Sequence, residues 1–252
     1  MTRAFWVLLK RELGAIFLSP VSHVIFALFN LVMGFSFWFC AAYMAQGARN
    51  VTVMQIFFII FYFWFCLIIM IPIFTMRLFA EEYRSGTIEL LMSAPVLEWD
   101  VILSKFFASV ALYAGLWLPT LVYLWVYQAL TRHQVPVEWG ALGASYLLVL
   151  VIGLFYVAIG LFTSSLTKNQ VLAAFASFVI IALLFFTGFL GFTAAGTGEG
   201  TARLIDYLAT LKHMQTFAGG VFDTRPLVFY LSGTGLFLFL TYVVISLRKL
   251  RY

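Results

Sequence analysis

The stretch FFIIFYFWFCLIIMIPIF at residues 57–74 has no charged side chain and consists almost entirely of large apolar and aromatic residues. It does not alternate between apolar and polar residues, as a strand of a membrane β-barrel would. A helix of about 20 such residues, rising 1.5 Å per residue, crosses about 30 Å of hydrocarbon. Because backbone polar groups must be hydrogen-bonded inside lipid, the stretch predicts a membrane-spanning helix.

The composition of the whole chain agrees with this prediction. Of its 252 residues, 64% are hydrophobic and only 10% are charged, whereas a soluble domain is about 45–50% apolar. The fold class expected is therefore an all-α integral membrane protein surrounded by lipid. The net charge of +5 does not require a nucleic-acid partner, because Lys and Arg collect on the cytoplasmic side of membrane proteins.

Long apolar runs predict six transmembrane helices within a single domain, residues 1–252. The expected spans are about 21–44, 53–76, 106–130, 141–163, 170–192 and 227–247. The connections between most of them are too short to form domains of their own.

Residues 2–18 predict an amphipathic helix that lies in the membrane surface. Arg3, Lys10 and Arg11 gather on one side of such a helix, and most of its apolar residues lie on the other. Glu12 is the exception, because it falls on the apolar side.

The distribution of Lys and Arg predicts the orientation. With the N-terminus inside, the inner segments hold ten: Arg3, Lys10, Arg11, Arg77, Arg84, Lys105, Lys168, Arg248, Lys249 and Arg251. The outer segments then hold five: Arg49, Arg132, Arg203, Lys212 and Arg225. The excess favours two cytoplasmic termini.

Two connections carry structure of their own. In the outer connection before the last span, ARLIDYLATLKHMQTFAGGVF (202–222) predicts a short helix closed by Gly219 and Gly220. The inner stretch RLFAEEYRSGTIELLMSAP (77–95) predicts that the second span continues beyond the bilayer and breaks at Ser85-Gly86. A second short helix then follows, ended by Pro95.

This inner stretch has two interpretations. Ile88, Leu91 and Met92 are spaced to form an apolar patch on a short helix, which suits the groove of a cytoplasmic partner. Alternatively, the stretch is a solvated loop whose charges keep it out of lipid. The residue pattern alone leaves both open.

Catalytic motifs are absent from the sequence. Glu81-Glu82 is followed by Arg84, which is too close for the Glu-Glu-x-x-x-Arg signature of intramembrane proteases, and no phosphate-binding G-x-x-x-x-G-K-[ST] loop occurs. The predicted spans two to six contain no Asp, Glu, Lys or Arg that could couple an ion. We therefore expect a non-enzyme whose energy comes from a partner; the alternative is a secondary, ion-coupled transporter, or another multi-span protein without an ATPase partner.

The chain resembles the membrane subunit of an ABC exporter of the six-helix class whose ATPases are separate chains. EEYRSGTIELLMSAP (81–95) matches the pattern Glu-Glu-x-x-x-Gly-Thr-x-Glu-x-Leu-x-x-x-Pro of this family. HMQTFAGGVFDTRPLVFYLS (213–232) resembles the segment before the last span in permeases of the gliding-motility and nitrous-oxide-reductase-maturation type.

The resemblance implies partners and a coupling element. Two cytoplasmic ATPase subunits would bind ATP and Mg, with no cofactor in this chain. Further expected partners are a second permease, identical or related, and extracytoplasmic accessory proteins. The complex would sit in the inner membrane and would export a substrate or do conformational work on an external partner, with the element near 196–222 covering the exit. The residues expected to couple to the ATPase are Glu81, Glu82, Arg84, Gly86, Thr87, Ile88, Glu89, Leu91, Met92 and Pro95.

Overall fold

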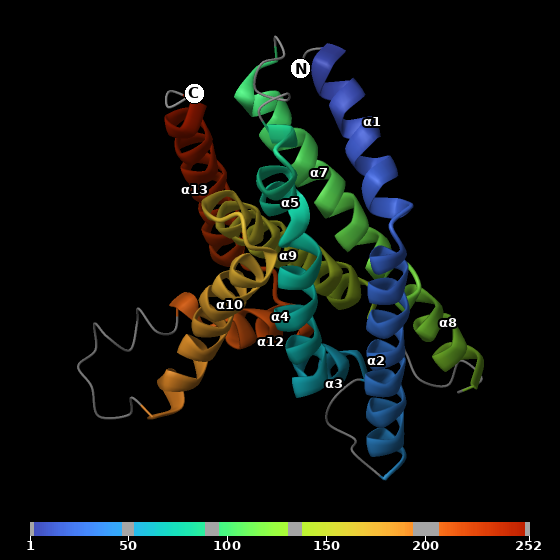
Figure 1. Cartoon of the computed structure of the whole chain (residues 1–252). Helices are drawn as coiled ribbons and strands as arrows, with labels where there is room; N and C mark the ends of the chain where they lie inside the picture. The colour runs from blue at the N-terminus through green and yellow to red at the C-terminus, as the bar shows by residue number, and fades with distance from the viewer. Residues whose placement is uncertain (1–2, 47–52, 89–95, 131–137, 194–206, 250–252) are drawn as a thin grey trace.

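The computed structural model describes residues 3–46, 53–88, 96–130, 138–193 and 207–249. Within these ranges every regular element is a helix (Figure 1), which confirms the all-α class. The helices are α1 (Arg3–Phe17), α2 (Pro20–Ala45), α3 (Val53–Ile59), α4 (Phe61–Thr75), α5 (Arg77–Ser85), α7 (Glu98–Trp117), α8 (Thr120–Leu130), α9 (Trp139–Leu166), α10 (Gln170–Thr193), α12 (Thr210–Ala218) and α13 (Thr224–Lys249).

Six helical segments of the described chain are long and apolar enough to cross a membrane, as predicted. They are Pro20–Ala45, Phe61–Ser85, Glu98–Ala129, Trp139–Leu166, Gln170–Gly188 and Thr224–Lys249. Many of their large apolar side chains face outward, among them Leu31, Trp38, Phe175 and Val228. Outward apolar surface of this kind suits contact with lipid.

The second predicted span, 53–76, is not one continuous helix. Ile60 has an extended backbone that separates α3 from α4. The indole of the buried Trp64 donates a hydrogen bond to the carbonyl of Phe58 across this break, at 3.0 Å. The helical direction can therefore change here while this carbonyl stays paired.

The third predicted span, 106–130, lies within a longer helical segment. Its helix starts at Glu98 and is interrupted between Trp117 and Thr120, where Pro119 supplies no backbone N–H. Lys105, within this helix, is buried between two carboxylates.

Helix α9 is the centre of the bundle and contacts α4, α5, α7, α10, α12 and α13. Two glycines of α9 allow neighbouring helices to approach it closely. A Cβ at Gly153 would overlap the ring of Tyr113, and one at Gly160 would overlap Thr75. Small residues at such contacts let helix backbones pack closely in membranes.

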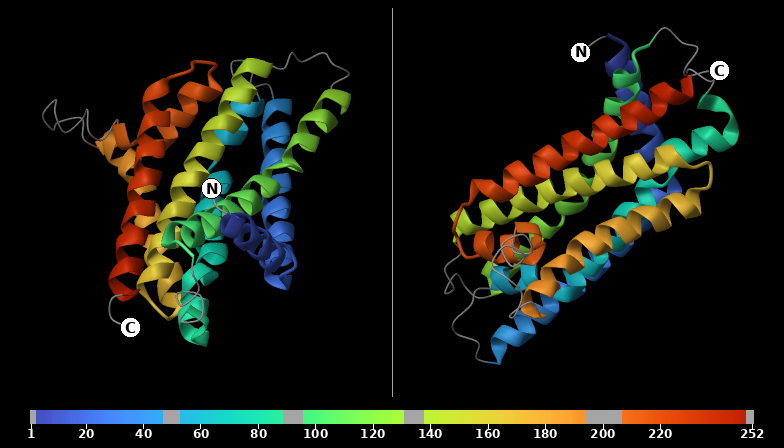
Figure 2. Two further views of the ribbon diagram at one scale, coloured as in Figure 1. Left: turned by 90° about the horizontal axis from the view of Figure 1, so that it is seen from above. Right: turned by 90° about the vertical axis from the view of Figure 1, so that its left-hand side faces the viewer.

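Helix α1 crosses the direction of the long helices rather than following it (Figure 2). It packs along α7, and Arg3, Lys10 and Arg11 are exposed. This orientation suits the predicted surface helix. The N-terminal end of α1 and the C-terminal end of α13 lie on the same side of the molecule as the C-terminal end of α5 (Figure 1).

The connection between α10 and α13 contains the expected short helix, α12 (Thr210–Ala218), although residues 194–206 lie outside the described ranges. Gly219 follows its last residue, and Gly220 has a φ of +80°, as the glycine pair predicted. The side chains of Met214 and Phe217 are buried and hold α12 against the bundle.

Candidate functional site

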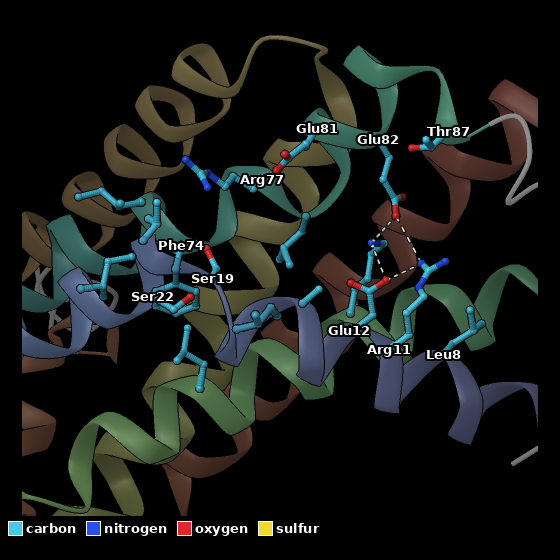
Figure 3. Close-up of a pocket in the computed structure, with 18 of the residues that line it drawn as sticks. Leu8, Arg11, Glu12, Ser19, Ser22, Phe74, Arg77, Glu81, Glu82 and Thr87 are labelled. Atoms are coloured by element: carbon cyan, nitrogen blue, oxygen red, sulfur yellow. Dashed lines mark hydrogen bonds and ion pairs between the residues drawn. The ribbon is translucent and has the colours of Figure 1, made fainter.

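A cavity of about 830 Å³ opens between the surface helix α1 and the joint of α4 and α5 (Figure 3). Its walls come from α1, the start of α2, the end of α4, α5 and α7. The lining includes an unusual share of the charged residues of this mostly apolar chain: Arg11, Glu12, Arg77, Glu81, Glu82 and Lys105. Three cationic and three anionic side chains therefore meet where the predicted coupling stretch leaves the bundle.

Four of these residues form one ion-paired cluster, which we call the inner charge cluster: Arg11, Glu12, Glu82 and Lys105. The Nζ of Lys105 lies 2.7 Å from Oε1 of Glu82 and 3.1 Å from Oε1 of Glu12. Nη2 of Arg11 lies 2.7 Å from Oε1 of Glu12 and 3.7 Å from Oε1 of Glu82. The cluster thus joins α1, α5 and α7 (Figure 3).

Lys105 is the buried centre of this cluster, since its side chain is only 3% exposed. An isolated buried ammonium would be strongly destabilising, but two carboxylates compensate it here. Removal of either charge sign would leave the other sign uncompensated at a largely buried position. The cluster therefore holds α1, α5 and α7 in one relative arrangement.

The carboxyl of Glu12 depends most directly on these neighbours. Burial by itself would raise its pKa, but the charge of Lys105 and the hydrogen bonds from Arg11 and Lys105 outweigh burial, so the pKa lies below the ordinary value of 4.5. The carboxylate form is thus favoured in the folded chain.

The lowered pKa of Glu12 predicts acid-sensitive stability. A group whose pKa is lowered by folding stabilises the fold fully above its unfolded pKa, and this contribution disappears as pH falls through the folded pKa. We expect the unfolding temperature of the detergent-solubilised chain to fall more steeply between pH 6 and pH 3 than that of Glu12→Gln. Parallel pH profiles of the two proteins would contradict this assignment.

The hydroxyl of Ser164, on α9, makes hydrogen bonds to the backbone at the joint between α4 and α5. Ser164 donates a hydrogen bond to the carbonyl of Met76 at 2.9 Å and accepts hydrogen bonds from the backbone N–H groups of Phe79 and Ala80, at 3.0 and 3.1 Å. These are backbone groups at the end of one helix and the start of the next, where intrahelical partners are missing. Ser164 thereby fixes the direction in which α5 leaves α4.

The C-terminal end of α13 holds the opposite side of α5. The guanidinium of Arg248 lies 4.5 Å from the ring centroid of Tyr83 and donates to the carbonyl of Leu166 at 2.7 Å. Next to it, Nζ of Lys249 lies 2.6 Å from Oε1 of Glu98. Helix α5 is therefore connected by polar contacts to α1, α7, α9 and α13.

The structure distributes the predicted coupling residues over several environments. Glu81 and Arg84 are exposed on α5, whereas Glu82 belongs to the inner charge cluster. Gly86 ends α5 with a φ of +74°, a left-handed conformation that favours glycine. The hydroxyl of Thr87 is 2.9 Å from that of Ser85.

Of the three residues of the predicted apolar patch, only Ile88 lies within the described residues. Ile88 is 4% exposed and packs into the core of this chain, so in the isolated chain its side chain is not available on the surface. Glu89, Leu91, Met92 and Pro95 lie outside the described residues.

Sequence reasoning missed most of the contacts that hold α5. The position of Glu12 on the apolar side of the amphipathic pattern indicated that this carboxylate has a partner within the protein. Lys105 gave a further signal, because it stood just before an apolar run. Nothing in the local sequence marked Ser164 or Arg248 as partners of α5.

The comparisons with known proteins agree with this architecture. A family model described as ABC-2 family transporter protein matches residues 6–248. The match includes all six candidate spans except the last residue of α13. A search of curated proteins found no match.

Proposed function

Because the chain belongs to the ABC-2 family of transporter proteins, and is thus a multi-pass membrane component of an ABC transporter, we propose that separate cytoplasmic ATPase subunits drive it. Two such subunits, which bind ATP and Mg, would act on two membrane subunits, this chain and a second copy or a related permease. The motion would export a substrate or do conformational work on an external partner. The sequence of residues 213–232 favours the gliding-motility or nitrous-oxide-reductase-maturation type.

The observation that carries this proposal is the way α5 is held. It ends in the left-handed Gly86 next to the coupling stretch, and it is bound on one side by the inner charge cluster and on the other by Arg248. A displacement applied at residues 87–95 would therefore reach α1, α7 and α13 through polar contacts. Packed interfaces of this kind pass a local shift into a change between two arrangements.

We place the chain in the inner membrane. In the proposed orientation α5 and both termini are on the cytoplasmic side, and α12 is on the opposite, outer side. This orientation is supported by the ten Lys and Arg residues of the inner segments against five outside. It is also supported by the common position of the N-terminal end of α1, the C-terminal end of α13 and the end of α5 (Figure 1). Extracytoplasmic accessory proteins would then meet the face that carries α12.

Glu81, Glu82, Arg84, Gly86, Thr87, Ile88, Glu89, Leu91, Met92 and Pro95 remain the proposed coupling residues, with different roles. Glu81 and Arg84 are exposed and suit direct contact with the ATPase. Glu82 acts from within, by holding α5 against Lys105.

Charge reversal at Arg84 tests direct contact with the ATPase. We expect Arg84→Glu to weaken stimulation of the co-purified ATPase about tenfold, because a charge pair across an interface contributes about 1–2 kcal/mol or more. The unfolding temperature should be unchanged, since Arg84 is exposed. The measurement is ATP hydrolysis by the reconstituted complex.

Arg225→Glu is the matched control, because Arg225 is also exposed but stands at the start of α13, far along the helix from Arg248. It should leave ATP hydrolysis unchanged. Equal effects of both reversals would contradict a contact at Arg84. Ion-dependent uptake by the purified chain alone would instead support a secondary transporter.

A further inference from the structure

The cavity beside α5 has walls of two different chemical characters. The start of α2 and the end of α4 contribute apolar residues, among them Ile25, Ile73 and Phe74, while the charged residues come from α1, α5 and α7. Since α4 runs into α5, Ile73 and Phe74 stand shortly before Arg77 along the chain. A volume of about 830 Å³ is within the usual range of ligand sites, about 300–1,000 Å³.

Arg77 and Glu81 are the two lining charges outside the inner charge cluster. The Nε of Arg77 is enclosed and makes no hydrogen bond, and no described carboxylate, Glu81 included, forms an ion pair with Arg77. Figure 3 shows it apart from the paired residues. An enclosed N–H group without a partner is costly, so an acceptor oxygen at this position would be stabilised.

We infer that the cavity binds a phosphate-bearing amphiphile from the leaflet in which α1 lies. The guanidinium of Arg77 would hold the phosphate, because its planar fork matches phosphate oxygens. The apolar chain would lie against Ile25, Ile73 and Phe74. Basic pockets between transmembrane helices bind lipid head groups in the same way. The inference does not depend on the ATPase partner.

Photolabelling of the purified full chain in a phosphate-free detergent tests this site. The probe is a phosphatidic acid that carries a diazirine in its acyl chain, and labelled peptides are mapped by mass spectrometry. We expect labels at the start of α2 and the end of α4. Arg77→Gln should lower this labelling about tenfold, as expected for a lost charged hydrogen bond, whereas Arg77→Lys should retain more of it.

Arg84→Gln is the matched control, because Arg84 is on the same helix but does not line the cavity; its labelling should equal that of the unmodified chain. A diazirine diacylglycerol, which lacks the phosphate, should label the cavity weakly in the unmodified chain, and this comparison does not rely on the folding of any variant. Equal labelling by the two probes, or undiminished labelling of a folded Arg77→Gln, would overturn the inference. Displacement of the probe by millimolar inorganic phosphate would also overturn it, in favour of a free-phosphate site.

Discussion

Replacement of Lys105 by methionine is expected to lower the free energy of unfolding by about 3–5 kcal/mol. Methionine has a similar length and suits an apolar environment, so the loss would come from the charge. Without the ammonium, Glu12 and Glu82 would be two neighbouring carboxylates with side chains only 10% and 17% exposed. The measurement is unfolding of the detergent-solubilised chain, followed by circular dichroism.

Lys249→Met is the matched control for this prediction. Its ion pair with Glu98 is equally short, at 2.6 Å, but the Lys249 side chain is 44% exposed. Exposed ion pairs contribute about 0–1 kcal/mol, so this variant should unfold almost like the unmodified chain. A triple variant, Lys105→Met with Glu12→Gln and Glu82→Gln, should recover part of the lost stability, because the one charge that it leaves unpaired in the cluster, Arg11, is 54% exposed. Equal stability of Lys105→Met and Lys249→Met would show that the cluster does not stabilise the fold.

Gly160→Val is expected to destabilise the chain by about 3 kcal/mol, the upper part of the usual range for overpacking. A side chain at residue 160 would overlap Thr75, which is buried and donates a hydrogen bond to the carbonyl of Ile71. The overlap involves the Cβ of Thr75, so the backbones of α4 and α9 would have to separate. Because α5 follows α4 directly, ATPase stimulation should also fall in the proposed complex.

Gly143→Val provides the control with the same substitution on the same helix. A Cβ at Gly143 meets nothing within 4 Å, and the position is exposed. Its effect on unfolding should lie within about 0.5 kcal/mol, as for most surface substitutions. If both valine variants unfold at one temperature, close packing of α9 against α4 is not what stabilises this region.

The number and type of the helices followed from the sequence because lipid imposes a simple rule on apolar length. Helix boundaries followed less well where that rule has exceptions. The predicted third span began at residue 106, whereas α7 begins at Glu98 and includes Lys105, which the structure pairs with two carboxylates. The break at Ile60 was invisible, since its stabilising contact, from Trp64 to Phe58, depends on backbone geometry.

The site could be predicted only where its signal was local. Gly86 was predicted to end α5, because glycine is favoured in left-handed helix ends. The partners of Glu82 could not be predicted, because Lys105 is 23 residues away and lies on another helix. Ile88 was expected on a surface patch from its spacing alone, but spacing does not say whether a face meets solvent or the core of the same chain.

The distance along the chain between Glu12 and Lys105 has a consequence for biosynthesis. The two residues are 93 positions apart, so the ribosome has made the first two spans before the ammonium that neutralises Glu12 exists. Until then, the only cation of the cluster available to the carboxylate of Glu12 is Arg11 on the same helix. Helix α1 therefore gains its contact with Lys105 only after synthesis of α7 has begun, and nascent chains that stop before Lys105 should be degraded by membrane proteases more readily than longer ones.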